Sequence, residues 1–368
     1  MKAICILFII NSIQLSGQSL SGKIINSYTN QPVVYATIYV NKSTNGTLSN
    51  NEGVFTLTGI TYPCEIVMSH VSYNTVLLTL DQKSGSDLLI NATPKVIEIG
   101  EITIVDENLR KKNIQRFKDG LLGIDKWGEN AILENDSNLI FNVAYFDESI
   151  SDSSLVGKSR IFQVKATAPL RIELPLLGYD LQYDLDTYEE KYDPVLRSNV
   201  VSIYGSSYYK PKSEFSHRET NRYRRNRMKA YFFSPQHFTR SFYDNKLREN
   251  GYLLAYKSSG SIDLFYEEFV IDSCDCITYV KKGAIVTGLK DYDFILRYYK
   301  NFSGYPIDIN VKSTEGYQWV SARIYFLNDT CLIREDGTRP RNSITFGDGM
   351  QDKRIGATLP SDYIPEYY

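Results

Sequence analysis

The sequence contains few of the residues from which hydrolytic and metal-dependent active sites are usually built. Its 368 residues include three histidines, and none of them begins an H-E-x-x-H motif. His70 and His217 also lack the glutamate three positions later that an H-x-x-E zinc motif requires. A G-x-S-x-G nucleophile motif and a glycine-rich phosphate loop are absent as well. We therefore expect no catalytic residues, no metal site and no cofactor.

Strong net charge and long apolar segments are also missing. The formal net charge is −2, from 41 basic and 43 acidic residues, which argues against nucleic acid or an anionic membrane surface as the main partner. After residue 17, no unbroken apolar run approaches the roughly 18 residues that a membrane-spanning helix needs. The mature chain is therefore expected to lack a transmembrane helix.

The N-terminus is the exception, because it is apolar over a short stretch. Lys2 precedes the apolar run Ala3–Ile10, and small and polar residues follow in "NSIQLSGQS". This order is typical of a secretory signal peptide at residues 1–17, and we predict cleavage after Gly17. Cys5 precedes most of the apolar segment, so a lipid-anchored cysteine is not expected there. The mature protein is predicted to be exported and to lie in the periplasm, at the outer membrane or outside the cell.

Export permits disulfides among the cysteines that remain after cleavage, which are Cys64, Cys274, Cys276 and Cys331. Four cysteines allow three pairings, and the sequence does not choose among them. A bridge from Cys274 or Cys276 to Cys331 is one hypothesis. The alternative, a metal bound by the C-x-C pair, lacks further ligands nearby.

Tyrosine is abundant, with 29 residues, and short β-like segments dominate residues 20–92. We interpret the tyrosines mainly as sheet packing, with a recognition surface as the alternative. In "VVYATIYV" (33–40) alternate positions are apolar, and Asn45-Gly46 is a hairpin signal. Further β-like runs follow at a spacing of roughly ten residues without a helical period. This pattern predicts a small β-sandwich.

The same segment resembles the carboxypeptidase-regulatory-like domain of exported bacterial proteins. The shared motifs G-x-[IV], PVxxAxVxV, GTxTDxxGxF and SxxGY read here as "GKI", "PVVYATIYV", "GTLSNNEGVF" and "SHVSY". Asn50 stands where the family has Asp, and Ser72 where it has Gly. The resemblance implies a seven-stranded transthyretin-like β-sandwich over residues 18–105, closed by a strand at 96–105. Such domains are not peptidases, and they precede catalytic domains, outer-membrane receptors and uncharacterised domains.

Residues 106–128 are predicted to form a connecting helix. Asp106 suits the N-cap position, and Gly123 suits the position after the last helical residue. Ile114, Phe117 and Leu121 lie on one face, so the helix is amphipathic.

The remaining residues, 129–368, alternate β-like runs with one clear helix. Ser234 is the expected cap of that helix, Pro235 its first residue and Gly251 its terminator, and Phe238 and Phe242 share a face. Together with the sandwich, this predicts a mostly β protein with an α+β second domain.

The second domain resembles the C-terminal domain of a poorly characterised group of exported proteins that also carry the regulatory-like domain. The resemblance rests on the runs "ATAPLRIELPLLGYDLQYDL", "NRMKAYFFSPQHFTRSF" and "LPSDY". It implies no established activity.

Two pairs of basic residues are candidate binding residues. His237 and Arg240 are three positions apart on the capped helix, so they share a face near its N-terminus that suits an anion or carboxylate. The alternative is a structural histidine bonded to backbone. Arg224 and Arg227 belong to the basic run 218–229, which suits phosphate or an acidic glycan. Its alternative is a solvated face that is partly paired with acidic residues.

The sequence therefore favours an exported, non-catalytic cell-envelope protein that binds or scaffolds a glycan or an outer-membrane protein. One alternative is an envelope hydrolase that uses His237 with a partner distant in the sequence. The other is a relative of the N-terminal region of outer-membrane receptors, against which the absence of many amphipathic strands after Tyr252 argues.

Overall fold

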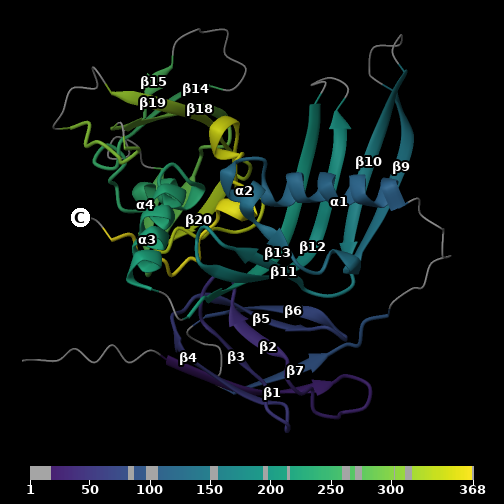
Figure 1. Cartoon of the computed structure of the whole chain (residues 1–368). Coiled ribbons are helices and arrows are strands. Elements are labelled where there is room, and N and C mark those ends of the chain that lie inside the picture. The colour runs from purple at the N-terminus through teal and green to yellow at the C-terminus, as the bar shows by residue number, and fades with distance from the viewer. Residues whose placement is uncertain are drawn as a thin grey trace, which may run out of the picture.

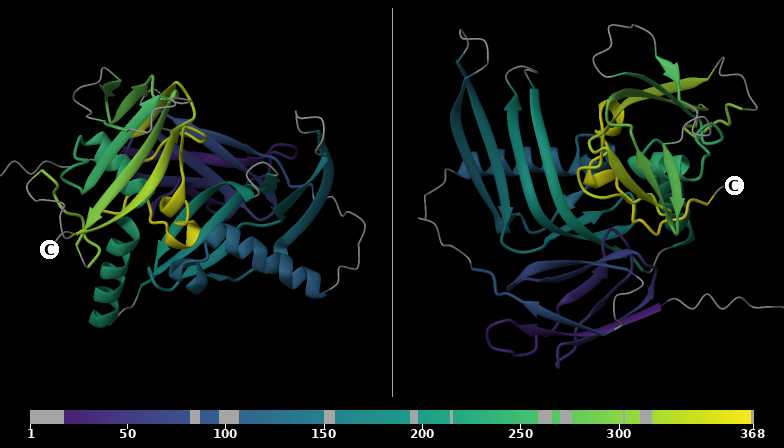
Figure 2. Two further views of the ribbon diagram at one scale, coloured as in Figure 1. Left: turned by 90° about the horizontal axis from the view of Figure 1, so that it is seen from above. Right: turned by 180° about the vertical axis from the view of Figure 1, so that it is seen from behind.

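The computed structural model describes residues 18–81, 87–96, 107–149, 156–193, 198–213, 216–258, 266–269, 276–301, 303–310 and 317–366. These residues are mostly β and build two hydrophobic cores, one within residues 20–92 and the other within residues 117–359. The first unit lies beneath the second in Figure 1, and the view from behind in Figure 2 shows the same arrangement. The predicted signal peptide and residues 97–105 of the predicted closing strand lie outside the described residues.

The N-terminal unit is a sandwich of two sheets, with seven strands among the described residues. The strand orders are β4-β1-β7 and β3-β2-β5-β6, and only β1 and β7 pair in parallel. The strands are β1 (Gln18–Asn26), β2 (Thr37–Val40), β3 (Gly46–Leu48), β4 (Val54–Ile60), β5 (Cys64–His70), β6 (Tyr73–Leu80) and β7 (Asp87–Ala92). Alternate residues such as Phe55 and Leu57 are buried between the sheets. The predicted seven-stranded sandwich is confirmed.

The segment "GTLSNNEGVF" forms β3 and the turn into β4. The Asn50 side-chain oxygen accepts hydrogen bonds from the backbone N–H groups of Glu52 and Val54, at 3.0 and 2.8 Å. Gly53 has a φ of 74°, which glycine adopts without the steric cost of a Cβ. Asn50 can accept the same two hydrogen bonds as the Asp of the family motif, because both side chains have an acceptor oxygen at this position.

The second unit begins with a sheet of six strands around the long strand β12 (Tyr179–Asp193). β12 pairs along one edge with β13 and along the other with β11 and then β10. The remaining strands are β8 (Ile132–Leu133), β9 (Leu139–Ser149), β10 (Val156–Ala166), β11 (Leu170–Leu174) and β13 (Ser198–Pro211), and the 3₁₀ turn η1 (Asp136–Asn138) precedes β9. All of these pairs are antiparallel, and β12 is the central strand.

Helix α1 (Glu107–Leu122) crosses one face of this sheet, as Figure 1 shows, and α2 (Lys126–Asn130) follows it. Phe117 is fully buried, and its ring meets the edge of the Tyr188 ring with centroids 4.8 Å apart. Gly120 permits this contact, because a Cβ there would lie 1.9 Å from the Tyr188 hydroxyl oxygen. The segment predicted as a connecting helix therefore contributes side chains to the second core.

The ends of α1 agree with the sequence pattern where they can be compared. The helix stops at Leu122, and Gly123 follows with a φ of 98°. The predicted cap, Asp106, lies outside the described residues.

The rest of the chain forms two further sheets that pack around helix α4 (Pro235–Tyr243), which follows α3 (His217–Tyr231). Their strand orders are β15-β14-β18-β19-β21 and β16-β17-β20. The strands are β14 (Tyr252–Ser258), β15 (Glu267–Glu268), β16 (Ile277–Val280), β17 (Gly283–Thr287), β18 (Tyr292–Lys300), β19 (Gln318–Phe326), β20 (Thr330–Arg334) and β21 (Ile344–Phe346), and the 3₁₀ turns η3 (Asp348–Met350) and η4 (Ile355–Ala357) come last. Phe238 and Phe242 of α4 are fully buried against the rings of Phe346 and Phe326.

Helix α4 begins as predicted, with Ser234 as its cap and Pro235 as its first residue, but it ends before Gly251. Its last residue is Tyr243, because Asn245 adopts a left-handed φ of 53° and turns the chain. Gly251 lies instead in the turn before β14, with a φ of 78°. Asn is the residue that most often takes the place of glycine in this left-handed position after a helix.

The turn of the sandwich that contains Lys42 and Ser43 connects the two units, because it lies between β13 and the C-terminal segment. The Lys42 N–H donates to the Ser207 carbonyl at 2.8 Å, and the Tyr209 N–H donates to the Ser43 carbonyl at 3.0 Å, which is a short parallel bridge. From the other side, the Ser361 N–H donates to the Lys42 carbonyl at 2.5 Å. These backbone bonds fix the position of the turn relative to the second unit.

A buried carboxylate provides a second link between the units. Asp184 of β12 is 6% exposed and accepts hydrogen bonds from the hydroxyl groups of Tyr39 (2.7 Å), Ser69 and Thr75 (3.1 Å) of the sandwich. The side-chain amide of Gln182 adds a further donor at 3.1 Å. Burial and then the charge of Asp184 raise the pKa of Tyr39, so the phenol stays protonated and remains a donor. The carboxylate is therefore satisfied only while the two units are docked.

Gly46 allows the same interface to close. Asn45-Gly46 signals a hairpin, and β2 and β3 do form one, but the left-handed residue of the turn is Lys42, with a φ of 64°. A Cβ on Gly46 would lie 2.6 Å from the ring of Tyr208 on β13. That ring stacks on Tyr39 with centroids 5.2 Å apart. Glycine is needed here for packing between the units rather than for the turn.

We expect the substitution Asp184→Ala to destabilise the docked state by about 3 kcal/mol, because it leaves buried donors without an acceptor. Differential scanning calorimetry should show a lower melting temperature and two transitions in place of one. Asp186→Ala is the matched control, because Asp186 is exposed and pairs with Arg341 at the surface, at 2.7 Å. Equal effects of the two substitutions would contradict the role given to Asp184.

The substitution Gly46→Ala is expected to lower the free energy of unfolding by about 2 kcal/mol, because the new methyl group overpacks the Tyr208 ring. Gly347→Ala serves as the control, since the nearest atom to a Cβ there lies at 3.4 Å, which is ordinary contact. Urea denaturation measures both. If Gly46→Ala is as stable as the control, the ring moves aside and the close packing is not required.

Candidate functional site

His237, the first candidate binding residue, is enclosed in the core of the second unit and is 1% exposed. Its Nδ1 lies 2.8 Å from the hydroxyl oxygen of Tyr252, and the Phe233 N–H donates to the same nitrogen at 3.4 Å. Burial, followed by the charges of Lys353 and Arg240, lowers the pKa of His237 to about 3. The imidazole is therefore neutral at physiological pH.

The surroundings of His237 give it a structural role. Because Nδ1 accepts the Phe233 N–H, the proton of the neutral ring is on Nε2, which has no hydrogen-bond partner within the described part of the chain. The rings of Tyr231, Phe232 and Tyr298 pack around it, with centroids 4.9, 5.3 and 6.0 Å from that of the imidazole. A general base must reach its substrate, and His237 lines none of the cavities described below. The hydrolase alternative centred on His237 therefore lacks an accessible base.

Arg240 is occupied by backbone carbonyl groups. Its guanidinium donates to the carbonyl oxygens of Asp336 (2.9 Å), Ser361 (2.6 Å) and Tyr363 (2.8 Å). The acceptors belong to the turn after β20 and to the C-terminal segment, so Arg240 attaches both of these segments to α4. His237 and Arg240 thus have separate structural partners and do not form a shared anion site.

Arg227 and Arg224 of α3 are engaged as well. Arg227 donates from Nε to the Leu177 carbonyl at 2.7 Å and from Nη2 to the Gly178 carbonyl at 3.2 Å. Arg224 forms an ion pair with Glu366 at 2.5 Å. Both arginines therefore bind other parts of this chain, Arg227 two backbone carbonyl groups and Arg224 an acidic side chain.

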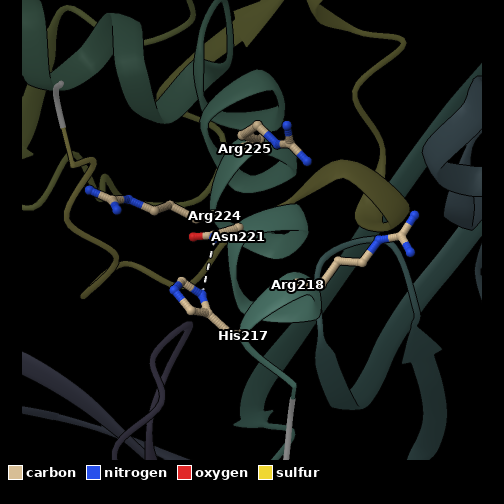
Figure 3. A pocket seen from close by; sticks show the side chains of 5 residues that line it. All are labelled: His217, Arg218, Asn221, Arg224 and Arg225. Atoms are coloured by element: carbon tan, nitrogen blue, oxygen red, sulfur yellow. Dashed lines mark hydrogen bonds between the residues drawn. The ribbon is translucent and has the colours of Figure 1, made fainter.

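A shallow groove along α3 contains the exposed part of the basic run. It is lined by His217, Arg218, Asn221, Arg224 and Arg225. Figure 3 shows that these side chains radiate from the helix and do not converge on one point, with His217 bonded to Asn221 at 3.1 Å. Because they come from a single helix and enclose no space, the groove offers positive charge but no built site.

The cysteines do not form the predicted bridge. Cys331 is a free, buried thiol on β20, so the pairing of Cys274 or Cys276 with Cys331 is wrong. The reason is the strand order β16-β17-β20, which places β17 between Cys276 and Cys331 and separates them by about 10 Å. Cys276 is disulfide-bonded, and Cys274 lies outside the described residues. Cys64 is a free thiol, and burial raises its pKa to about 11.

A cavity of about 650 Å³ lies between the two units, a volume typical of small-molecule sites. The sandwich contributes residues 40–45 and 59–65, and the second unit contributes residues 334–339 and 361–365 together with Arg240 and Lys282, apart from a few positions within these ranges. The cavity is therefore completed only when the two units are docked.

The lining of this cavity combines charge with apolar surface. The basic side chains besides Arg240 are Lys42, Lys282, Arg334 and Arg339, and the acidic ones are Glu65, Glu335, Asp336 and Asp362. Ile60, Tyr62, Pro63, Ile364 and Pro365 supply apolar surface. Such a mixture suits an organic ligand that carries polar groups.

In the described part of the chain, no group of three or more His, Cys, Asp and Glu side chains is placed to bind a metal ion. None of the helices in this part has the length and apolar character needed to cross a membrane.

Comparison with known proteins identifies the sandwich. Residues 20–104 match the family model of the CarboxypepD_reg-like domain. The match confirms the resemblance found in the sequence, and this CarboxypepD_reg-like domain fits a non-catalytic N-terminal module.

Other comparisons add little. A search of the curated proteins gave no match. Among solved structures, a protein of unknown function from Bacteroides fragilis, described as membrane-associated, aligns with 90% of this chain and 99% of its own length. The identity is 11% and the TM-score is 0.17, and values this low support no conclusion about fold or function.

The cavity residues were not found from the sequence, because they come from four segments and two single residues that are spread between positions 40 and 365 of the chain. The hairpin signal at Asn45-Gly46 indicated the correct turn, but the residue of this turn that has a left-handed φ and brings a charge to the cavity is Lys42. No sequence pattern marks Arg334 and Arg339 as binding residues, since they lie on either side of an ordinary turn after β20.

The pKa of His237 predicts an acid-dependent loss of stability. The folded-state value of about 3 lies below the ordinary 6.5, so between these pH values the unfolded chain binds a proton that the folded chain does not. We expect the free energy of unfolding to fall by about 2 kcal/mol between pH 6.5 and pH 5 from this group alone. Urea denaturation at a series of pH values measures the slope.

His237→Gln should remove that part of the slope, whereas His217→Gln, at an exposed position of α3, should leave it unchanged. Parallel pH profiles for the wild type and His237→Gln would mean that His237 is not held neutral in the fold.

Proposed function

We propose that this protein is an exported cell-envelope protein that binds a glycan or an outer-membrane protein without transforming it. In this proposal the CarboxypepD_reg-like domain and the second domain act as one binding unit. The observation that carries it is the cavity between the domains, because residues from both are required to line it. A loosely attached module would not share a site in this way.

The contacts between the domains support a rigid unit. The backbone bonds of Lys42 and Ser43 to β13, and the hydroxyl groups bonded to Asp184, leave little freedom for one domain to move relative to the other. A rigid shared site favours binding, because less conformational entropy is lost when the ligand is captured.

The placement of His237 supports a non-catalytic role. His237 is buried and neutral, and Arg240, Arg227 and Arg224 bond to other parts of the chain. The signal-peptide pattern at residues 1–17 supports export to the envelope. The basic surface of α3 is a second feature that suits acidic envelope polymers.

Binding of the mature chain, residues 18–368, to three purified envelope fractions tests the proposal. The fractions are peptidoglycan sacculi, lipopolysaccharide and outer-membrane protein in detergent, and biolayer interferometry measures the affinity. We expect saturable binding to one of them, with the bound material recovered chemically unchanged by mass spectrometry. Asp184→Ala should weaken this binding at least tenfold because it undocks the domains, and Asp186→Ala should not.

Cleavage or other chemical change of the bound material would replace the proposal with an enzyme. A lack of binding to all three fractions would remove its support.

A further inference from the structure

The cavity between the domains has basic groups that are not neutralised by the chain itself. Lys42, Lys282 and Arg339 have no ion-pair partner among the described residues, and none of their side chains forms a hydrogen bond there. The Nε of Arg334 is buried and unpartnered, and its Nη1 has only a long contact, 3.5 Å, to the hydroxyl of Thr338. Four cationic side chains with unused donors therefore line one cavity.

The acidic side chains of the cavity are used differently. Asp362 accepts the N–H and the hydroxyl of Thr44, at 3.0 and 2.6 Å. Asp336 accepts the N–H and the hydroxyl of Thr338, at 2.8 and 2.6 Å.

Glu65 accepts the side-chain amide of Asn41 at 2.8 Å, so it too has a neutral donor from the chain. Glu335 is the remaining acid, and it is exposed. Three of the four acids therefore already accept donors from the chain, whereas the side-chain donors of Lys42, Lys282 and Arg339 are unused, and acceptor oxygens of a ligand match these donors.

Two of the cations come from opposite sides of the domain boundary. Lys42 comes from the CarboxypepD_reg-like domain and Arg339 from the second domain. Lys42 is exposed to solvent. Its pKa is nevertheless lowered, first because the surrounding protein atoms remove part of its solvation and then because of the charge of Arg339. Burial lowers the pKa of Arg339 to about 10. An anion between the two would relieve their repulsion and replace lost solvation.

The backbone presents Lys42 to the cavity in a conformation that a lysine rarely adopts. Its φ of 64° favours glycine, and its N–H and carbonyl are both bonded to the second domain. A glycine at this position would keep the backbone bonds and relax the φ angle, so stability alone does not account for the lysine. We therefore attribute the lysine at this position to its side chain, which lines the cavity and makes no bond within the described chain.

We propose that the cavity binds an anionic sugar, with its carboxylate or phosphate between Lys42 and Arg339 and its carbon skeleton against Ile60, Pro63 and Ile364. The inference rests on the proposed function and narrows its glycan to an acidic one. The oxygen atoms of the sugar acid accept from the lysine ammonium and the arginine fork. The volume of about 650 Å³ accommodates a mono- or disaccharide.

Isothermal titration calorimetry of the mature chain with D-glucuronate, D-glucose 6-phosphate and neutral D-glucose tests the proposal. We expect one of the anions to bind at least tenfold more tightly than glucose, with an affinity that falls as salt is raised. A preference for glucuronate identifies the carboxylate as the recognised group, and a preference for glucose 6-phosphate identifies the phosphate. Either preference supports the inference.

Lys42→Gly and Arg339→Gln should each weaken binding of the anion at least tenfold, while Lys42→Gly melts at or above the wild-type temperature. The matched controls lie outside the cavity. Asn30→Gly relaxes another left-handed residue (φ 58°). Arg297→Gln removes an arginine that lies over the Trp319 ring at 5.3 Å, as Arg339 lies over the Phe346 ring at 4.8 Å. Neither control should change the affinity.

Equal affinity for glucose and both anions, or unchanged affinity in Lys42→Gly and Arg339→Gln, would overturn the inference. If the wild type binds an envelope fraction but no anionic sugar, the acidic site fails and the proposed function stands. If it binds neither, both fail.

Discussion

The carboxylate of Asp184 is the group on which the arrangement of the two domains depends. It belongs to the second domain, yet three of its donors, the hydroxyl groups of Tyr39, Ser69 and Thr75, come from the CarboxypepD_reg-like domain. A buried carboxylate without donors is costly, so the second domain is stable in this form only when the first is docked on it. The docking in turn presses Gly46 against a tyrosine ring and seats the preceding turn beside β13, which brings the wall of the cavity into place.

Several cations in this protein act as structural links rather than as binding groups. Arg240 and Arg227 each donate to backbone carbonyl groups of distant segments. Lys353 donates to the carbonyls of Ala230 and Phe232 at 2.8 and 2.5 Å, where α3 ends and carbonyl groups lack helical partners. These bonds hold irregular segments that have few backbone partners of their own. Lys42, Lys282 and Arg339 of the cavity contrast with them, because their side-chain donors remain unused in the described chain.

Buried aromatic groups account for much of the tyrosine content and for the state of His237. Tyr252 and Tyr298 are buried around the imidazole, and Tyr188 anchors α1 on its sheet. This matches the interpretation of tyrosine as sheet packing. The same surroundings remove water from His237 and keep it neutral, so a histidine that follows a well-formed helix cap is a core residue here.

Local patterns in the sequence were sufficient wherever a feature depends on neighbouring residues. The turn at Asn50 and Gly53, the start of α4 at Pro235 and the strands of the sandwich follow from side-chain acceptors, positive φ angles and alternation, all of which act over a few residues. Only the tertiary structure determines that Cys331 is a free thiol and which carbonyl groups Arg240 binds, because strand order and long-range docking decide which groups come into contact. The cavity is the clearest case: Lys42 and Arg339 are almost 300 positions apart, and only the docking around Asp184 brings their charges to one space.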